Sequence, residues 1–265
     1  MYRRFLHEPV PGYEAIIAKP FENRFLLEQI PDFYERLKSS YDEKFYQQEV
    51  LGENLNLGGA TVYHAFRRAD HVRELERDPT LPLLWALDFN VDPMCSVVAQ
   101  MNGEVVYGLD EITISRATTE DACEECQRRF PRHYQGVIVY GDATGHRMQT
   151  SGTNDYEVVR NYFRREAYPN VDYRVPRSNP PVRERVELVN AKLRSAAGEI
   201  RMYVERRCRE LIRDFEEVSY RQETTIIDKD KNPKRTHLSD ALGYLVWQEW
   251  REWAGAGEKA VGLVS

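Results

Sequence analysis

Three aspartates lie where an apolar stretch meets polar sequence, and carboxylates in such positions can hold cations. Asp88 ends LPLLWALD, Asp142 follows GVIVYG, and Asp240 lies in the first turn of the helical stretch THLSDALGYLVW. The first two stretches are short and rich in Val, Ile, Leu and Trp, which is typical of buried strands in a covered sheet. A carboxylate at the edge of such a sheet is costly unless it is paired, hydrogen-bonded or bound to a cation. Three of them converging at one edge would form a site for hard divalent cations such as Mg2+, as a two-metal phosphodiester hydrolase requires.

Each aspartate also has a purely structural explanation. Asp88 could cap a turn with the Asp92-Pro93 pair, and Asp142 could form an Asx turn, because aspartate favours turns. The helix dipole would stabilise Asp240 in the first turn of a helix whatever its function. The metal-site interpretation therefore depends on the three residues occurring together.

The surroundings of Asp142 exclude one class of enzyme. Nucleoside triphosphatases also place a Mg2+-binding aspartate after an apolar strand, but they need GxxxxGK[ST] for the phosphates. Nothing in this sequence matches that motif, so we expect no ATP hydrolysis by this chain. Gly141 and Gly145 flank Asp142 and would let a phosphate approach the backbone closely.

The composition is that of an ordinary soluble globular protein, with 42% apolar and 30% charged residues in 265. No run of about eighteen apolar residues predicts a membrane span, and the first residues lack the apolar core of a secretion signal. Four cysteines are too few and too scattered for a disulfide framework, which indicates reduced thiols in a cytosolic compartment. They are Cys95, Cys123, Cys126 and Cys208, of which the middle two form a CxxC inside a helical stretch.

Charge is distributed unevenly along the chain. The formal net charge of −6 does not indicate a nucleic-acid binder. However, residues 173–213 contain eleven Lys and Arg against five Asp and Glu, whereas residues 1–60 contain seven against ten. A basic segment beside an acidic metal site suits a protein that holds a polyanion and cuts it. Solvated helix faces produce such runs as well.

Residues 1–60 are expected to form a small helical appendage and a linker. Between residues 21 and 53, apolar and aromatic side chains recur at helical spacing, and Pro31 suits a first helical turn. Gly52 and the Gly58-Gly59 pair then interrupt the pattern.

The remaining residues, 61–265, predict one α/β domain with a mixed sheet and helices on both faces. Expected strands cover residues 81–89, 94–101, 104–114, 136–142 and 171–176, and residues 200–204 are expected to form a short extended segment. Expected helices cover residues 118–131, 154–168, 181–196, 205–217 and 237 to about 253. Asn102-Gly103 indicates a short hairpin turn, and residues 221–236 are expected to form a second β-hairpin turning near Lys231–Pro233. Three consecutive strands followed by alternating helices and strands are the order expected for an RNase H-like fold.

Several segments together resemble one protein family. WALDFNVDP, VYGDATG, VNAKL and THLSDALGY are similar to the C-terminal nuclease domain of the large terminase subunit of tailed bacteriophages. The preceding IPDFYERLKSSY and QQEVLGE resemble the segment that links the packaging ATPase to that nuclease. The resemblance covers nearly the whole chain, but the ATPase motifs of a full-length large subunit are missing. We therefore expect a C-terminal fragment, an excised domain or a separately encoded nuclease half.

The resemblance implies an endonuclease that cuts double-stranded concatemeric viral DNA during genome packaging. It implies Asp88, Asp142 and Asp240 as catalytic metal ligands, with Asp92 as a candidate fourth carboxylate. The cofactors would be two Mg2+ or Mn2+ ions, bridged by Asp88. The implied partners are double-stranded DNA, the packaging ATPase domain, the portal and the small terminase subunit, and the implied location is the host cytoplasm with no membrane attachment.

Further residues are candidates for contacts with DNA phosphates or with the metal ligands, although each is also explained as an ordinary surface residue. They are Lys192, His146 and His237, together with Lys229, Lys231, Lys234 and Arg235 of the second expected hairpin.

Two other functions are compatible with the sequence. The chain could be another RNase H-like nuclease, such as a resolvase or transposase core, although the terminase-like segment at residues 31–53 argues against this. It could also be a non-catalytic docking module for a motor or portal, with vestigial carboxylates.

Overall fold

The computed structural model describes residues 20–52, 61–90, 92–150, 152–221, 224, 226–230 and 235–261, the last ten as backbone only. Among these residues, seven strands form one mixed sheet in the order β1-β7-β4-β3-β2-β5-β6. The strands are β1 (Val72–Arg73), β2 (Leu83–Asp88), β3 (Met94–Asn102), β4 (Val105–Ile114), β5 (Val137–Gly141), β6 (Val171–Tyr173) and β7 (Met202–Glu205). The expected α/β class and the five expected strands are confirmed, the expected extended segment at residues 200–204 overlaps β7, and the two-residue strand β1 is additional.

The first three long strands form an antiparallel meander at the centre of the sheet. β2 pairs with β3 and β3 with β4, both antiparallel, while β5 lies parallel to β2 and β6 parallel to β5. The β3–β4 hairpin is confirmed, with its turn one residue later than expected. Asn102 pairs with Val105, so Gly103 and Glu104 are the central turn residues, and Gly103 has the positive φ of 58°.

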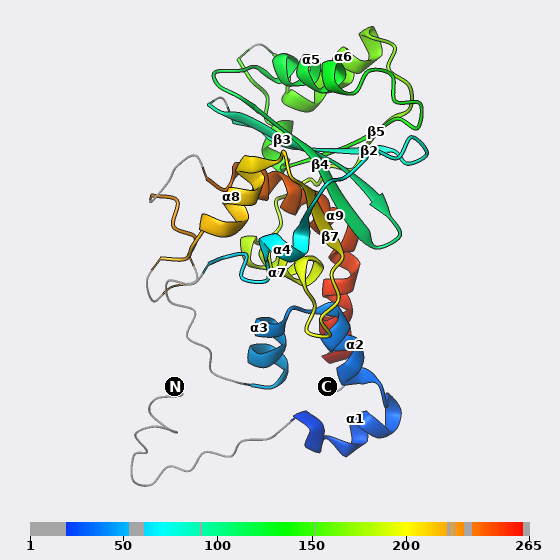
Figure 1. Cartoon of the computed structure of the whole chain (residues 1–265), viewed down its shortest axis with the longest axis vertical. Helices are drawn as coiled ribbons and strands as arrows, with labels where there is room; N and C mark the ends of the chain where they lie inside the picture. The colour runs from blue at the N-terminus through cyan, green and yellow to red at the C-terminus, as the bar shows by residue number, and fades with distance from the viewer. Residues whose placement is uncertain are drawn as a thin grey trace.

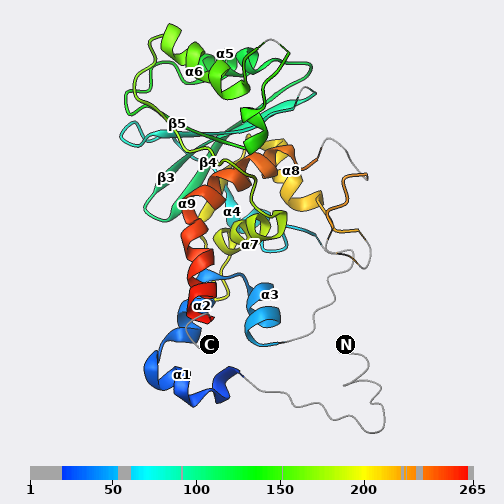
Figure 2. The same ribbon diagram turned by 180° about the vertical axis from the view of Figure 1, so that it is seen from behind.

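Helices cover both faces of the sheet (Figures 1 and 2). α5 (Thr119–Arg129) and α6 (Asp155–Arg165) lie on one face, and α7 (Val182–Leu193), α8 (Arg209–Glu217) and α9 (His237–Val261) on the other. Alternate residues of β2 enter the two cores: Trp85 packs in the α5–α6 core and Ala86 in the α7–α9 core. Because both faces are covered, β2 is buried along its whole length, which explains its uninterrupted apolar sequence.

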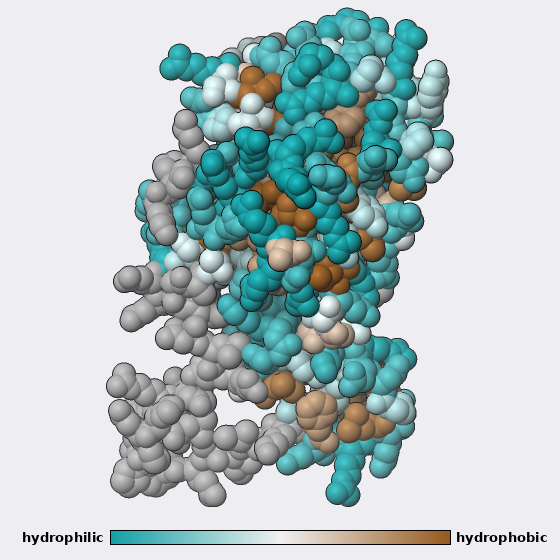
Figure 3. Space-filling view, viewed as in Figure 1, coloured by the Kyte–Doolittle hydropathy of each residue, from teal (hydrophilic) through white to brown (hydrophobic). Residues whose placement is uncertain are grey.

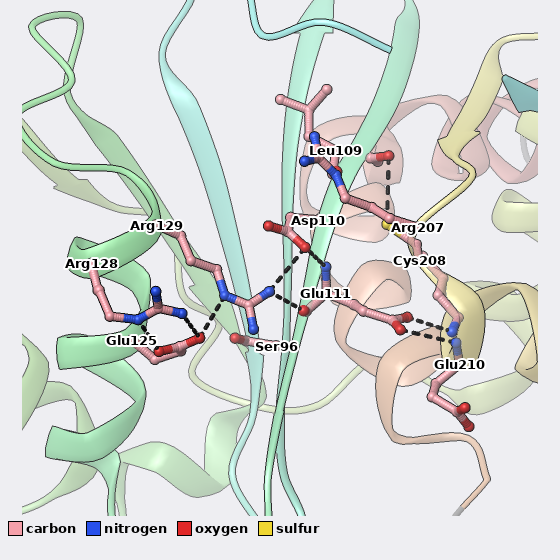
Figure 4. Close-up of polar contacts among 12 residues, drawn as sticks. Ser96, Leu109, Asp110, Glu111, Glu125, Arg128, Arg129, Arg207, Cys208 and Glu210 are labelled. Carbon is pink, nitrogen blue, oxygen red and sulfur yellow. Dashed lines mark hydrogen bonds and ion pairs between the residues drawn. The ribbon is translucent and has the colours of Figure 1, made fainter. Parts of the chain in front are cut away.

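A polar network attaches α5 and α8 to β4 (Figure 4). Arg129 of α5 donates to Asp110 Oδ1 at 3.0 Å. The carboxylate of Glu111 accepts the backbone N–H groups of Glu210 and Leu211 at 3.0 and 2.8 Å. Glu111 therefore satisfies the free donors in the first turn of α8 and fixes where this helix begins.

The described part of the appendage is helical, as expected. It contains a 3-10 turn (Pro20–Glu22), α1 (Arg24–Gln29), α2 (Phe33–Ser40), α3 (Glu43–Phe45) and a π-helical turn (Tyr46–Val50). Backbone hydrogen bonds attach it to the segment after α7, where Ala196 N donates to Tyr41 O at 2.8 Å and Ala197 N to Lys38 O at 3.1 Å. Figure 1 shows the appendage at the end of the molecule opposite α5 and α6.

The second expected hairpin is wrong for the residues that the structure describes. Residues 226–230, 235 and 236 belong to no strand, and Tyr220 instead forms a single antiparallel bridge with Ile227. The chain therefore turns between residues 221 and 226, and the expected turn at Lys231–Pro233 lies outside the described residues. The mixture of Thr, Ile, Asp and Lys in this segment suits a strand locally, but it supplies no apolar face for the sheet.

The remaining elements are short. α4 (Arg68–His71) precedes β1, and a 3-10 turn (Ala143–His146) follows β5. All four cysteines are buried and free, and burial raises the pKa of the Cys126 thiol, so the CxxC in α5 is part of the core. Within the described residues, no helix has the length and apolar character needed to cross a membrane.

Candidate active site

Asp88 and Asp142 lie side by side because of the strand pairing. β2 and β5 are parallel neighbours, and Leu87 pairs with Gly141. Asp88 and Asp142 each come one residue later, where the carboxyl ends of the two strands meet at one edge of the sheet. Both side chains are buried, with 7% and 6% of their surface exposed. The sequence predicts three carboxylates at this edge, and the strand pairing brings two of them, Asp88 and Asp142, to it.

The Asp88 carboxylate has two hydrogen-bond partners, both on its Oδ2. Asn90 Nδ2 donates to it at 2.6 Å, and His237 Nδ1 lies 2.9 Å away. This hydrogen bond raises the pKa of the His237 imidazole, while burial acts in the opposite direction. His237 begins α9, so the contact joins the end of β2 to the start of the helix that carries Asp240.

The Asp142 carboxylate is only half satisfied. Thr144 Oγ1 donates to Oδ2 at 2.5 Å, but Oδ1 is buried without a hydrogen-bond partner. Burial raises the pKa of Asp142, and the nearby charge of Asp88 raises it further. A buried carboxylate oxygen without a donor is unusual in a native protein. A carboxylate oxygen that binds a metal ion has no hydrogen-bond donor when the ion is absent, which matches Asp142 Oδ1.

Asp240 differs from the other two aspartates because both of its oxygens face cations. Arg185 Nη2 donates to Oδ1 at 2.6 Å, and Lys229 Nζ lies 3.5 Å from Oδ2. Burial raises the pKa of Asp240, and the charges of Arg185 and Lys229 act against it. The charge of Asp88 also raises this pKa, which places Asp240 within electrostatic reach of Asp88.

The carboxylates of Asp88 and Asp142 are better suited to bind a hard cation than the carboxylate of Asp240. Among the described residues, no group of three or more His, Cys, Asp or Glu side chains is gathered closely enough to hold a metal ion. The pair of Asp88 and Asp142 fits such an ion, because Asp142 Oδ1 is buried and unpartnered. Asp240 can bind a metal ion only if one of its two cationic partners, Arg185 or Lys229, moves away from its carboxylate.

Comparison with known proteins identifies the family. A profile described as "Terminase RNaseH-like domain" matches residues 85–249, which is more than half of the chain and includes all three aspartates. The chain belongs to the terminase RNase H-like domain family. No curated protein sequence matches it.

Two solved terminase structures share the fold of this terminase domain, and a third matches it less closely. The large terminase of a thermophilic bacteriophage, in complex with ADP, matches with a TM-score of 0.62 and 17% identity, over 86% of this chain and 53% of that one. The P22 large terminase nuclease domain matches with a TM-score of 0.52 and 15% identity, over 71% and 91%. The large terminase nuclease domain of bacteriophage SPP1, with bound Mn, has a TM-score of 0.43 and 13% identity, over 67% and 94%. The chain thus spans about half the length of the ADP-bound large terminase.

Three other predicted site residues of the terminase domain have surroundings other than the aspartate carboxylates. The ammonium of Lys192 lies 3.9 Å from the ring centre of Trp250, and burial lowers its pKa to about 8. Asp92 is exposed, and His146 is exposed with its ring 4.7 Å from that of Tyr156. Two further predicted residues do contact the aspartates: His237 contacts Asp88, and Lys229 contacts Asp240.

The predicted basic contacts are also largely neutralised. Arg235 is held by carboxylates of α8, at 2.9 Å from Glu210 and 3.2 Å from Glu217, which makes it a structural residue. Lys231 and Lys234 lie outside the described residues. In the basic segment 173–213, seven arginines form ion pairs with acidic residues of this chain. They are Arg174, Arg183, Arg185, Arg194, Arg201, Arg206 and Arg213.

The two glycines beside Asp142 have a packing role. A Cβ on Gly145 would lie 2.4 Å from Phe89 Cε2, and one on Gly141 would lie 2.7 Å from Tyr156 Oη. The space that was expected to admit a phosphate is filled by aromatic side chains, so the absence of Cβ atoms allows these rings to pack.

Sequence reasoning missed Arg185, the most deeply buried cation at the site. It is 4% exposed, its guanidinium lies 4.2 Å from the Tyr244 ring centre, and a Cβ on Gly243 would lie 2.9 Å from its Cδ. The signal was its position on the apolar face of α7, three and four residues before Leu188 and Val189. An arginine there requires a buried anion.

Proposed function

We propose that this chain is a divalent-metal-dependent endonuclease that cuts double-stranded viral DNA during genome packaging, by two-metal-ion phosphodiester hydrolysis. The observation that carries the proposal is the Asp88–Asp142 pair at the ends of neighbouring parallel strands, with Asp142 Oδ1 buried and unpartnered. Membership of the terminase RNase H-like family supports it, because the residues that match the family include both aspartates.

In this proposal each carboxylate has a defined task. Asp88 and Asp142 would hold one Mg2+ or Mn2+ ion, and Asp88 and Asp240 the second. When bound, the two ions supply activation of a water molecule and stabilisation of the leaving oxygen. His237 and Asn90 orient Asp88 through Oδ2, and Thr144 orients Asp142 through Oδ2. These contacts leave Asp88 Oδ1 and Asp142 Oδ1 without competition from those donors.

The partners in packaging follow from the same proposal. The chain lacks the phosphate-binding motif of an ATPase, and it matches only 53% of the solved large terminase that is described as a complex with ADP. We propose that a packaging ATPase domain, the portal and the small terminase subunit act with this chain on double-stranded DNA in the host cytoplasm.

The test is cleavage of supercoiled plasmid in Mn2+ or Mg2+, with and without a chelator. The proposal predicts nicked and then linear DNA with metal, and intact plasmid with the chelator. Cleavage restricted to four-way junctions would instead indicate a resolvase-type nuclease. Folded protein that leaves every DNA substrate intact in both metals would overturn the proposal in favour of a docking module.

A further inference from the structure

The two sides of the acidic site differ in how much positive charge they already hold. On one side, the hydrogen-bonding neighbours of Asp142 are all neutral (Thr144, the Gly145 backbone and Asn179), and its Oδ1 is buried without a partner at hydrogen-bond distance. On the other side, Asp240 has Arg185 on Oδ1 at 2.6 Å and Lys229 facing Oδ2 at 3.5 Å. A cation approaching Asp142 therefore meets an unbalanced carboxylate, whereas one approaching Asp240 meets a carboxylate with two positive neighbours.

The cations at Asp240 are held with very different strength. Arg185 is 4% exposed, and its side chain fills the space that Gly243 leaves open beneath the Tyr244 ring. Removing its charge from this pocket would leave a buried carboxylate unpaired, which is strongly destabilising. Arg185 is therefore a permanent partner of Asp240.

Lys229, in contrast, can leave. Its side chain is 59% exposed, and its contact with Asp240 is at the limit of hydrogen-bond length. It lies in a segment that belongs to no strand of the sheet, although Ile227 and Asp228 attach this segment to Tyr220 and Ser219, so only the exposed Lys229 side chain needs to move. Because the ammonium is largely solvated and makes only this long contact, a divalent ion can displace it from Asp240 Oδ2.

We propose that the two cation positions fill in a fixed order, with the Asp88–Asp142 position binding first and more tightly. In this scheme Lys229 is a tethered competitor at the Asp88–Asp240 position. The inference rests on the proposed function and adds an order of loading to it. The physical reason is Coulombic: the second ion must displace Lys229 and also bind near the fixed charge of Arg185, and both effects weaken it. A DNA phosphate would offer Lys229 another anion, so DNA is expected to strengthen the second position selectively.

The test is a titration of the full chain with Mn2+ without DNA, followed by electron paramagnetic resonance of free Mn2+ and by calorimetry. Wild type should show one stronger and one weaker position. Lys229→Gln should tighten the weaker position at least threefold and leave the stronger one unchanged. Lys38→Gln, which removes the same charge from α2 in the appendage, should change neither.

Carboxylate variants assign the two positions. Asp142→Asn should remove the stronger position, and Asp240→Asn should remove only the weaker one. Loss of the stronger position in Asp240→Asn, or an unchanged weaker position in Lys229→Gln, would overturn the proposed order while leaving the nuclease proposal intact. Asp88→Asn should bind neither ion. Wild type that binds no Mn2+ would overturn the proposed order, and the plasmid-cleavage assay then shows separately whether the nuclease proposal fails as well.

Discussion

At the scale of single residues, Asp142 combines burial, a neighbouring negative charge and an oxygen without a donor. Burial and Asp88 together raise the pKa of its carboxyl, so its ionised form costs stability in the metal-free protein. An amide of the same shape removes the charge, and the Thr144 hydroxyl can still donate to its oxygen.

We therefore predict that Asp142→Asn stabilises the metal-free protein by about 1 kcal/mol, the ordinary size of a single-residue effect. In the same variant, the rise in melting temperature on adding Mn2+ should be largely lost, because ligand-induced stabilisation requires binding. Thermal melts with and without Mn2+ measure both effects. Asp172→Asn, at a 69% exposed carboxylate on β6, is the control and should do neither. A metal-induced shift of wild-type size in Asp142→Asn would exclude Asp142 as a ligand.

The ion pair of Arg185 and Asp240 should be strongly coupled. Arg185→Gln leaves a buried carboxylate without its main partner and should cost about 3–5 kcal/mol. Adding Asp240→Asn in the same chain removes the unpaired charge and should recover a large part of that loss. Urea unfolding of the two single variants and the double variant gives the coupling energy. If the losses of unfolding free energy in the two single variants add up to the loss in the double variant, the ion pair at 2.6 Å contributes no coupling energy.

At the scale of elements, a relay of contacts positions the first turn of α9. Glu111 of β4 holds the start of α8, as Figure 4 shows. Asp214 of α8, 2% exposed, then accepts the backbone N–H of Ser239 at 3.1 Å. Ser239 lies between His237 and Asp240, so the relay sets where both residues meet Asp88.

The Asp214 link should give the fold a measurable pH dependence. Burial raises the pKa of Asp214 to about 6, outweighing the Ser239 N–H and Arg235. The folded state therefore holds a proton between about pH 4 and 6 that the unfolded state has released. Stability from this group is greatest at low pH and falls as pH rises through 6, by up to about 3 kcal/mol.

The corresponding prediction compares wild type with Asp214→Asn, which cannot titrate at this position. From about pH 4.5 to pH 7, the variant should gain stability relative to wild type, since other titrating groups are common to both proteins. Urea unfolding at the two pH values measures the difference. A stability difference that is constant with pH would show that Asp214 is already ionised in the folded state at the lower pH.

Much of this element arrangement could be predicted from sequence, and the failures have physical causes. Strands β2 to β5 were predictable because each is a short apolar run closed by turn residues. The hairpin expected at residues 221–236 was wrong because the described part of this segment pairs locally, Ile227 with Tyr220, at a different register from the expected one. Arg185 was missed because its partner, Asp240, is 55 residues away in sequence, and only the packing of α7 against α9 brings them together.

At the scale of the whole molecule, most basic side chains of segment 173–213 form ion pairs with acidic residues of the same chain. Hydrophilic residues cover most of the face in Figure 3, with hydrophobic residues in small separate patches. In the appendage, Phe21 and Phe25 are exposed. Seven of the eleven basic residues in segment 173–213 are in ion pairs with acidic residues. The basic stretch of the sequence is therefore not a continuous cationic surface.

This charge pairing predicts weak binding to duplex DNA with a modest salt dependence. Eleven phosphate contacts would give a slope near 10 in a plot of log affinity against log salt, at about 0.9 for each contact. Because most of these cations are already paired, we expect a slope of about 4 or less. Fluorescence anisotropy of a labelled duplex at several salt concentrations measures it. A slope of about 10 would mean that the ion pairs open to contact DNA.

The central claim is that Asp88 organises a metal-dependent nuclease site. The most direct measurement is plasmid cleavage in Mn2+ by Asp88→Asn beside wild type, with circular dichroism to confirm that both are folded. Loss of the residue that both cation positions share should reduce cleavage to the level of the chelated wild type, while the fold is retained. Cleavage by folded Asp88→Asn at the wild-type rate would contradict the account.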